Sequence, residues 1–150
     1  MMWNGAHDAY LENRILSADP LELVRLLYEA AIAAVRSARE RLAAGEIAAR
    51  SHSISKACEI LIELSAALDH SRGGEISSRL AALYHYMLNR LMDANLQQAD
   101  APLAEVLGLL TTLAEAWEQT RTPVEPQAVE SPWAAAAEPV LSGVAHAWSL

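Results

Sequence analysis

The chain has 150 residues, of which 53% are hydrophobic, and a formal net charge of −8. This length and composition indicate one folded domain with a substantial core, and they exclude a disordered chain. The acidic balance argues against a nucleic-acid-binding protein, which would carry a basic face, and against binding to an anionic membrane surface.

Three further features predict a cytoplasmic protein without membrane insertion. Cys58 is the only cysteine, so no internal disulfide is possible and a reducing compartment fits best. The N-terminal stretch MMWNGAHDAY has neither the basic region nor the apolar run of a secretory signal. No uncharged apolar stretch approaches the roughly 18 residues that a membrane span needs.

The first segment of interest, residues 9–18, precedes a strong helix start. Asp19 is a suitable N-cap, Pro20 fits the first helical position, and Glu22 follows three residues after the cap. The segment itself carries four large apolar residues, Tyr10, Leu11, Ile15 and Leu16. We predict that this segment lies across the folded domain as a strap.

Apolar residues then recur with helical spacing over most of residues 20–119. Gly45, the pair Gly73-Gly74 and Pro102 divide this region into four helices, and strand signals are almost absent. The sequence therefore predicts an all-α fold, an antiparallel up-down four-helix bundle with an N-terminal strap and an extra C-terminal tail. The predicted core residues are Val24, Val35, Leu61, Leu64, Leu83, Met87, Leu110 and Leu113.

The apolar stripes are wider than a single buried helix face requires. The additional apolar residues are Leu23, Leu26, Tyr28, Ile60, Ile62, Ala67, Tyr84, Tyr86 and Leu88. One interpretation is that they line surface grooves that a partner covers. The other is that they are ordinary exposed apolar groups, which are common on protein surfaces.

The composition changes after Gln119. Arg121 is the last basic residue, and residues 122–150 are rich in proline and alanine, with glutamate as their only charged residue type. We predict two parts, a helical bundle with its strap over residues 1–121 and a Pro/Ala-rich tail over residues 122–150. The first part of the tail is typical of a linker, whereas its end, PWAAAAEPVLSGVAHAWSL, is apolar enough to dock on a surface.

No pattern of catalytic or metal-binding residues is present in the sequence. It has no glycine-rich phosphate loop, no nucleophile elbow and no Glu-x-x-His pair, so we predict no enzymatic activity, no cofactor and no metal. Cys58 lies on an apolar stripe and is interpreted as a small buried hydrophobe. A histidine phosphotransfer domain is an alternative helical bundle, but neither His52 nor His70 has the His-x-x-Lys-Gly spacing of such domains.

Two blocks of residues stand out by their order and spacing. The first block contains Tyr10, Asn13, Ile15, Ser17-Ala18, Pro20, Glu22-Leu23 and Leu27-Tyr28. The second contains Leu64, Leu68-Asp69, Gly73-Gly74-Glu75-Ile76, Leu80, Leu83-Tyr84, Tyr86-Met87, Arg90-Leu91 and Ala94-Asn95. Together with Trp117 they resemble the FliS family of flagellar secretion chaperones over about residues 10–118. His85 departs from the family pattern, in which many members carry Asp, and the tail lies beyond the usual end of the family.

The resemblance implies a chaperone rather than an enzyme. It implies that the chain binds the disordered C-terminal segment of flagellin in the cytosol, prevents its premature polymerisation and delivers it to the flagellar type III export gate. The export-gate protein FlhA would recognise the complex there. A generic helical adaptor for another exported protein is the alternative. The residues expected to contact the client are Tyr10, Ile15, Leu27, Tyr28, Ile54, Leu68, Tyr84, Met87, Leu91 and Asn95.

The resemblance also suggests roles for the two ends of the chain. The strap would cover part of the client groove or clamp a bound client, and the alternative is that it is a permanent part of the core. The tail would occupy the client groove in cis at a high effective concentration. The alternatives for the tail are an unfolded segment or a docking patch for another export component.

Overall fold

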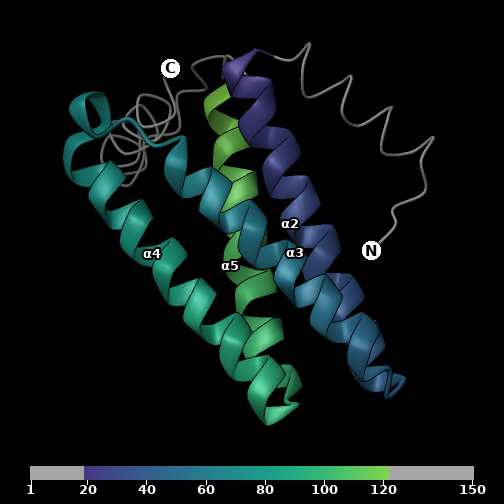
Figure 1. Ribbon diagram of the computed structural model, residues 1–150. Coiled ribbons are helices and arrows are strands. Elements are labelled where there is room, and N and C mark those ends of the chain that lie inside the picture. The colour runs from purple at the N-terminus through teal and green to yellow at the C-terminus, as the bar shows by residue number, and fades with distance from the viewer. Residues whose placement is uncertain (1–18, 122–150) are drawn as a thin grey trace, which may run out of the picture.

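Four α-helices account for most of residues 19–121, which are the residues that the computed structural model describes (Figure 1). The helices are α2 (Pro20–Ala43), α3 (Ile47–Ala66), α4 (His70–Gln97) and α5 (Asp100–Arg121). Residues 19–121 contain no strand, so the predicted all-α class and the four-helix bundle are confirmed. The predicted strap and tail lie outside the described residues.

Local sequence determines where α2 and α4 begin. The Asp19 side chain accepts a hydrogen bond from the Glu22 backbone N–H at 2.7 Å, and Pro20 occupies the first turn of α2. Asp69 caps α4 in the same way, because its Oδ1 accepts hydrogen bonds from the backbone N–H groups of Ser71 and Arg72. Each cap satisfies backbone donors that a helix leaves unpaired in its first turn.

The break predicted at Gly73-Gly74 lies inside α4 rather than before it. Asp69 starts a first helical turn at His70, and Gly74 then interrupts the helix with φ +52° and ψ −122°. Only glycine adopts this backbone conformation without strain, because it has no Cβ. The predicted break at Gly73-Gly74 therefore marks the junction between a first turn and the second, longer part of α4.

Gly74 and Gly108 form a matched pair of test positions. Gly74→Ala is expected to lower the free energy of unfolding by about 1–3 kcal/mol, because a side chain strains the backbone at this φ. Gly108→Ala is expected to raise it by about 0.5–1 kcal/mol, because Gly108 lies within α5 with no neighbouring atoms near an added Cβ. Urea unfolding of both variants measures the two effects. A change of the same sign in the free energy of unfolding of both variants would contradict this prediction.

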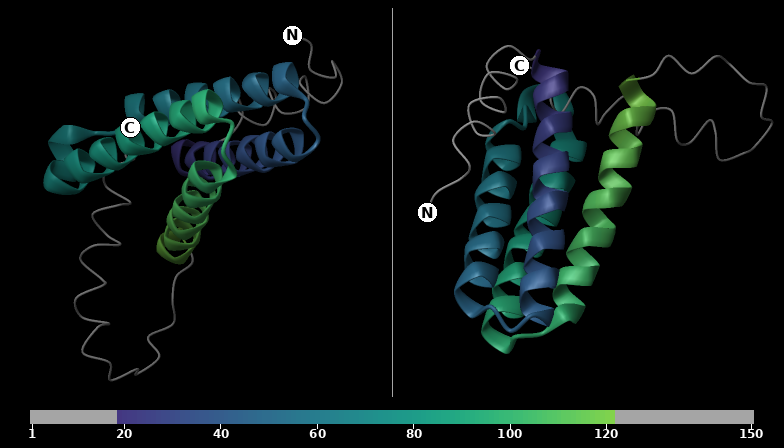
Figure 2. Two further views of the ribbon diagram at one scale, coloured as in Figure 1. Left: turned by 90° about the horizontal axis from the view of Figure 1, so that it is seen from below. Right: turned by 90° about the vertical axis from the view of Figure 1, so that its right-hand side faces the viewer.

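The helices form a closed circuit in which α2 packs against α3 and α5, and α4 packs against the same two helices. Short links join antiparallel neighbours, as expected of an up-down bundle. Figure 2 shows α5 running at an angle to the other three helices and diverging from α2 toward its C-terminal end. This end of the bundle is also where the described part of the chain begins and ends.

The core follows the predicted stripes closely. Six of the predicted core residues are buried, namely Val24, Val35, Leu61, Leu64, Met87 and Leu110. Leu83 and Leu113 are half-buried and pack against this cluster. The largest fully buried side chains also include Tyr28, Tyr84 and Trp117, which the sequence analysis had not placed in the core.

Candidate functional site

Most of the residues predicted to contact a client lie inside the bundle. The buried members of that set are Tyr28, Ile54, Leu68, Tyr84, Met87 and Leu91. Leu27 and Asn95 are half-buried, and Tyr10 and Ile15 lie outside the described residues. In this structure the six buried side chains form the core and offer no surface to a partner. The wide apolar stripes contained both core and surface positions, and helical spacing alone did not separate them.

Tyr28 and Tyr84 form a buried polar pair at the centre of the bundle. Their hydroxyl oxygens lie 2.6 Å apart and join α2 to α4 across the core. Burial raises the pKa of both phenols above the ordinary value, because an ionised oxygen would lose its hydration. The pair is therefore neutral and structural at physiological pH.

Because of this pair, the free energy of unfolding is expected to fall as the pH rises above about 10. The unfolded chain releases the two protons near pH 10 while the folded chain retains them, so the stabilisation is complete below about pH 10 and declines above it. The expected loss is about 1.4 kcal/mol per tyrosine for each pH unit. Urea unfolding at several alkaline pH values checks this. A Tyr28→Phe/Tyr84→Phe double variant is expected to show a shallower slope, and an unchanged slope would contradict the assignment.

Asn95 links α4 to α3, because its side-chain carbonyl oxygen is hydrogen-bonded within the bundle. That oxygen accepts hydrogen bonds from Ser51 Oγ at 2.9 Å and from Arg50 Nε at 3.3 Å. Arg50 is only 5% exposed, and none of the ion pairs among residues 19–121 involves it. Asn95 therefore supplies the hydrogen bond that a buried guanidinium requires.

Removal of this amide is expected to destabilise the bundle. Asn95→Ala leaves the buried Arg50 without its acceptor, so the free energy of unfolding is expected to fall by about 1–3 kcal/mol. Asn89→Ala is the matched control, because Asn89 is an exposed residue of the same helix. Chemical denaturation of both variants tests the role of Asn95, and equal midpoints would show that the tie contributes nothing.

The Ser51–Asn95 hydrogen bond also identifies which sides of α3 and α4 adjoin. Residues three and four positions apart lie on the same side of a helix, so counting from this pair defines a continuous surface. We call this surface the α3–α4 face. Its members are Ile47, Ser51, Ser55, Cys58, Ile62 and Ser65 on α3, and Ala81, His85, Leu88, Met92 and Asn95 on α4.

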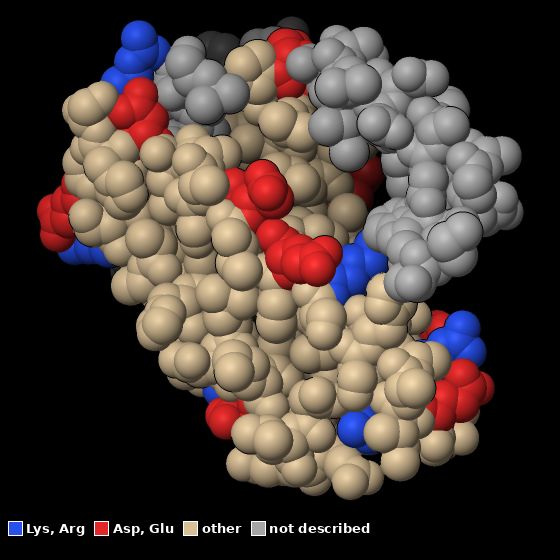
Figure 3. Space-filling model, in the orientation of Figure 1, with Lys and Arg blue, Asp and Glu red and all other residues tan. Residues whose placement is uncertain are grey.

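The α3–α4 face contains no Asp, Glu, Lys or Arg, although 20% of the chain is charged. Three of its large apolar side chains are exposed, Ile47 by 59%, Ile62 by 55% and Met92 by 58%. Figure 3 shows an uncharged expanse over α3 and α4, bordered by acidic and basic side chains. Exposed apolar side chains on an uncharged surface with a charged rim are typical of a protein interaction site.

Cys58 lies in the middle of the α3–α4 face and is half-buried. Burial raises the pKa of its thiol, and the neighbouring Glu59 carboxylate acts in the same direction. A thiol with a raised pKa is a poor nucleophile, which supports the interpretation of Cys58 as a packing residue.

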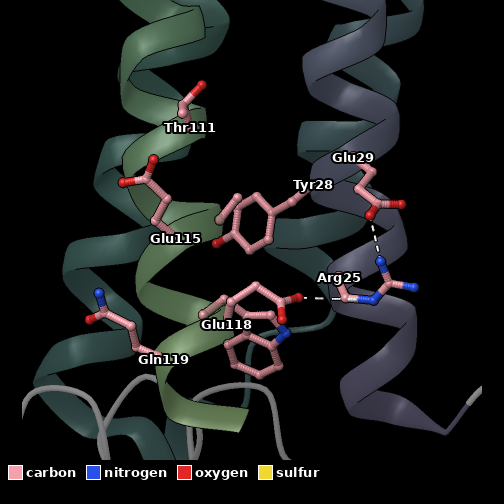
Figure 4. A pocket seen from close by; sticks show the side chains of 9 residues that line it. Arg25, Tyr28, Glu29, Thr111, Glu115, Glu118 and Gln119 are labelled. Atoms are coloured by element: carbon pink, nitrogen blue, oxygen red, sulfur yellow. Dashed lines mark hydrogen bonds and ion pairs between the residues drawn. The ribbon is translucent and has the colours of Figure 1, made fainter. Parts of the chain in front are cut away.

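A pocket of about 380 Å³ separates α2 from α5 where the two helices diverge, and we call it the α2–α5 pocket (Figure 4). Tyr28, Ala114 and Trp117 contribute its apolar lining. Its charged rim consists of Arg25, Glu29, Glu115 and Glu118. Arg25 forms ion pairs with the carboxylates of Glu29 and Glu118, so the rim carries an excess of negative charge.

Sequence reasoning found part of the α3–α4 face. Ile62 and Leu88 are among the apolar residues that exceed a single buried helix face, whereas the sequence pattern did not indicate Ile47 or Met92 as surface residues. The signal that identifies the face is the absence of charge at every third or fourth position along α3, combined with the same absence on the adjoining side of α4.

Within residues 19–121, no three side chains of His, Cys, Asp or Glu are close enough together to hold a metal ion. None of the helices in that range combines the length and the apolar character needed to cross a membrane.

Comparison with known proteins identifies relatives over most of the chain. The family model described as "Flagellar protein FliS" matches residues 2–124. The flagellar secretion chaperone FliS of Salmonella typhimurium is 41% identical over 110 residues, which cover 73% of this chain and 82% of the relative. FliS of Bacillus subtilis is 33% identical over 75% of this chain and 84% of the relative, and FliSB of Pseudomonas aeruginosa is 33% identical over 72% and 86%. Because the family model covers most of the chain and these relatives align over most of their own length, this chain belongs to the FliS family of flagellar secretion chaperones.

Proposed function

We propose that this chain is a cytosolic export chaperone that binds the C-terminal segment of flagellin on the α3–α4 face. Membership of the FliS family supports a chaperone role in flagellar export. The observation that carries the choice of site is the absence of any charged residue on the α3–α4 face of a chain whose net charge is −8. Exposed apolar side chains on an uncharged surface of an acidic domain favour coverage by an apolar partner.

The proposed binding mode is an amphipathic helix of the client lying along the face. Ile47, Ile62 and Met92 are more than half exposed in this structure and would be buried by the client. Burial of each such side chain contributes about 1.5–3 kcal/mol, and ordering of a disordered client costs about 2–5 kcal/mol or more. The surplus is small enough for the complex to release its client.

Coverage of the client in this way has two consequences for export. The apolar helix faces that flagellin buries against neighbouring subunits would be shielded in the cytosol, which prevents premature polymerisation. The covered client would reach the type III export gate bound to the chaperone, where FlhA would recognise the complex. Three of the residues predicted to contact the client remain candidates for that role, namely Tyr10 and Ile15 of the strap and the half-buried Leu27 of α2.

Calorimetric titration of the full chain with a synthetic flagellin C-terminal segment tests this proposal. We expect one-to-one binding, together with a gain of helix in circular dichroism beyond the sum of the two components. The same segment with its apolar residues replaced by serine is the matched control and is expected not to bind. If the unmodified segment does not bind, flagellin is not the client of this chaperone.

A further inference from the structure

The α3–α4 face has a candidate occupant within the same chain. The FliS family model ends at residue 124, so nearly all of the tail lies beyond the part that the family shares. We propose that residues 131–150 bind the α3–α4 face of their own chain and compete there with the client. This inference rests on the proposed function, because it assigns both ligands to one surface.

The position and length of the tail allow it to reach this surface. The tail follows Arg121, which ends α5 at the same end of the bundle as the link between α3 and α4 (Figure 1). A flexible chain with the length of residues 122–150 spans roughly 30 Å on average. The face extends from Ser65 to Ile47, which is about 27 Å along α3 at 1.5 Å per residue.

The chemistry of the tail matches that of the face. Residues 131–150 contain a single charged residue, Glu138. Beyond it, Val140, Leu141, Val144 and Trp148 follow one another at the spacings of one helix face. An apolar segment without Lys or Arg fits a surface that has no charged residue of its own.

The α2–α5 pocket lies closer to Arg121 but is a poorer partner for the tail. Its rim carries Glu29, Glu115 and Glu118 against the single cation Arg25. The tail after Arg121 has glutamates as its only charged residues, so the two would repel each other. Charge therefore favours the α3–α4 face over the nearer pocket.

A tethered occupant would act as a competitor for the client. Tethering through a short flexible linker gives an effective concentration in the millimolar range, so even weak binding would cover the face most of the time. The apparent association constant for the client is then the intrinsic constant multiplied by the fraction of chains whose face is uncovered. The tail would then keep the apolar face away from incorrect partners until flagellin displaces it.

Cys58 provides a direct readout, because it is the only cysteine and lies on the α3–α4 face. The rate at which a thiol reagent such as dithiobis-nitrobenzoate labels the folded full chain reports whether the face is covered. Val144→Asp is expected to raise this rate roughly tenfold, since loss of one apolar anchor shifts the intramolecular equilibrium by about that factor. Val124→Asp, the same substitution near the start of the tail, is the matched control and is expected to leave the rate unchanged.

The possible outcomes separate this inference from the proposed function. If Val144→Asp accelerates labelling and tightens binding of the flagellin segment, both stand. If the flagellin segment protects Cys58 but Val144→Asp changes nothing, the tail does not occupy the face, whereas the proposed function holds. If Val144→Asp accelerates labelling but the segment neither binds nor protects Cys58, the tail binds the α3–α4 face, whereas the proposed client and the competition with it are wrong. A labelling rate that falls as protein concentration rises would assign the face to a second copy and overturn the inference.

Discussion

Replacement of Trp117 by alanine is expected to lower the free energy of unfolding by about 3–5 kcal/mol, a large part of the stability of a domain of this size. The side chain is 1% exposed and is among the largest fully buried side chains in the core. Its indole Nε1 donates a hydrogen bond to the Leu21 carbonyl oxygen at 3.3 Å, which ties the end of α5 to the start of α2. Figure 2 shows α5 diverging from α2 toward this end, where Arg25 of α2 also forms an ion pair with Glu118 of α5.

Two measurements separate packing from the hydrogen bond in this prediction. Urea unfolding monitored by circular dichroism gives the total loss for Trp117→Ala. Trp117→Phe retains an aromatic ring but has no N–H donor, so it is expected to lose less than the alanine variant. If both variants lose the same amount, packing of the indole is not the main contribution. If neither loses more than about 1 kcal/mol, Trp117 is not part of the cooperative core.

The largest expected effect on function comes from Ile62→Asp. Ile62 is 55% exposed on the α3–α4 face, so the substitution is expected to change the stability of the free chain only slightly. In the proposed complex it would place an unpaired carboxylate in an apolar interface. The affinity for the flagellin C-terminal segment is therefore expected to fall roughly 100-fold, as measured by calorimetric titration.

A matched variant guards against general effects of added negative charge. Ala33→Asp introduces the same side chain at an exposed position on α2, away from the α3–α4 face. Its affinity for the segment is expected to stay within about twofold of the unmodified chain, since distant surface charges act weakly at physiological salt. Equal losses for the two variants would show that the client does not bind at the α3–α4 face.

The sequence by itself determined the number of helices, most of their ends and most of the core. Capping residues, turn glycines and apolar spacing act within a few residues of one another, so they are legible without a tertiary structure. Asp19 and Pro20 started α2 as predicted, and the stripe positions Val35, Leu61 and Met87 were buried as predicted. The two motif blocks also indicated the family, because their order and spacing can be read directly from the linear sequence.

Only the tertiary structure decided which apolar residues face inward and which face a partner. A helical stripe fixes positions relative to one another, but the neighbouring helices fix the rotation of each helix about its axis. Tyr28 and Tyr84, expected at a client surface, became a buried pair because α2 and α4 present them to each other across the core. Asn95 became a tie to α3, and the adjoining uncharged sides of α3 and α4 became one continuous face. That face joins residues more than 40 positions apart, such as Ser51 and Asn95, and only folding of the bundle brings them together.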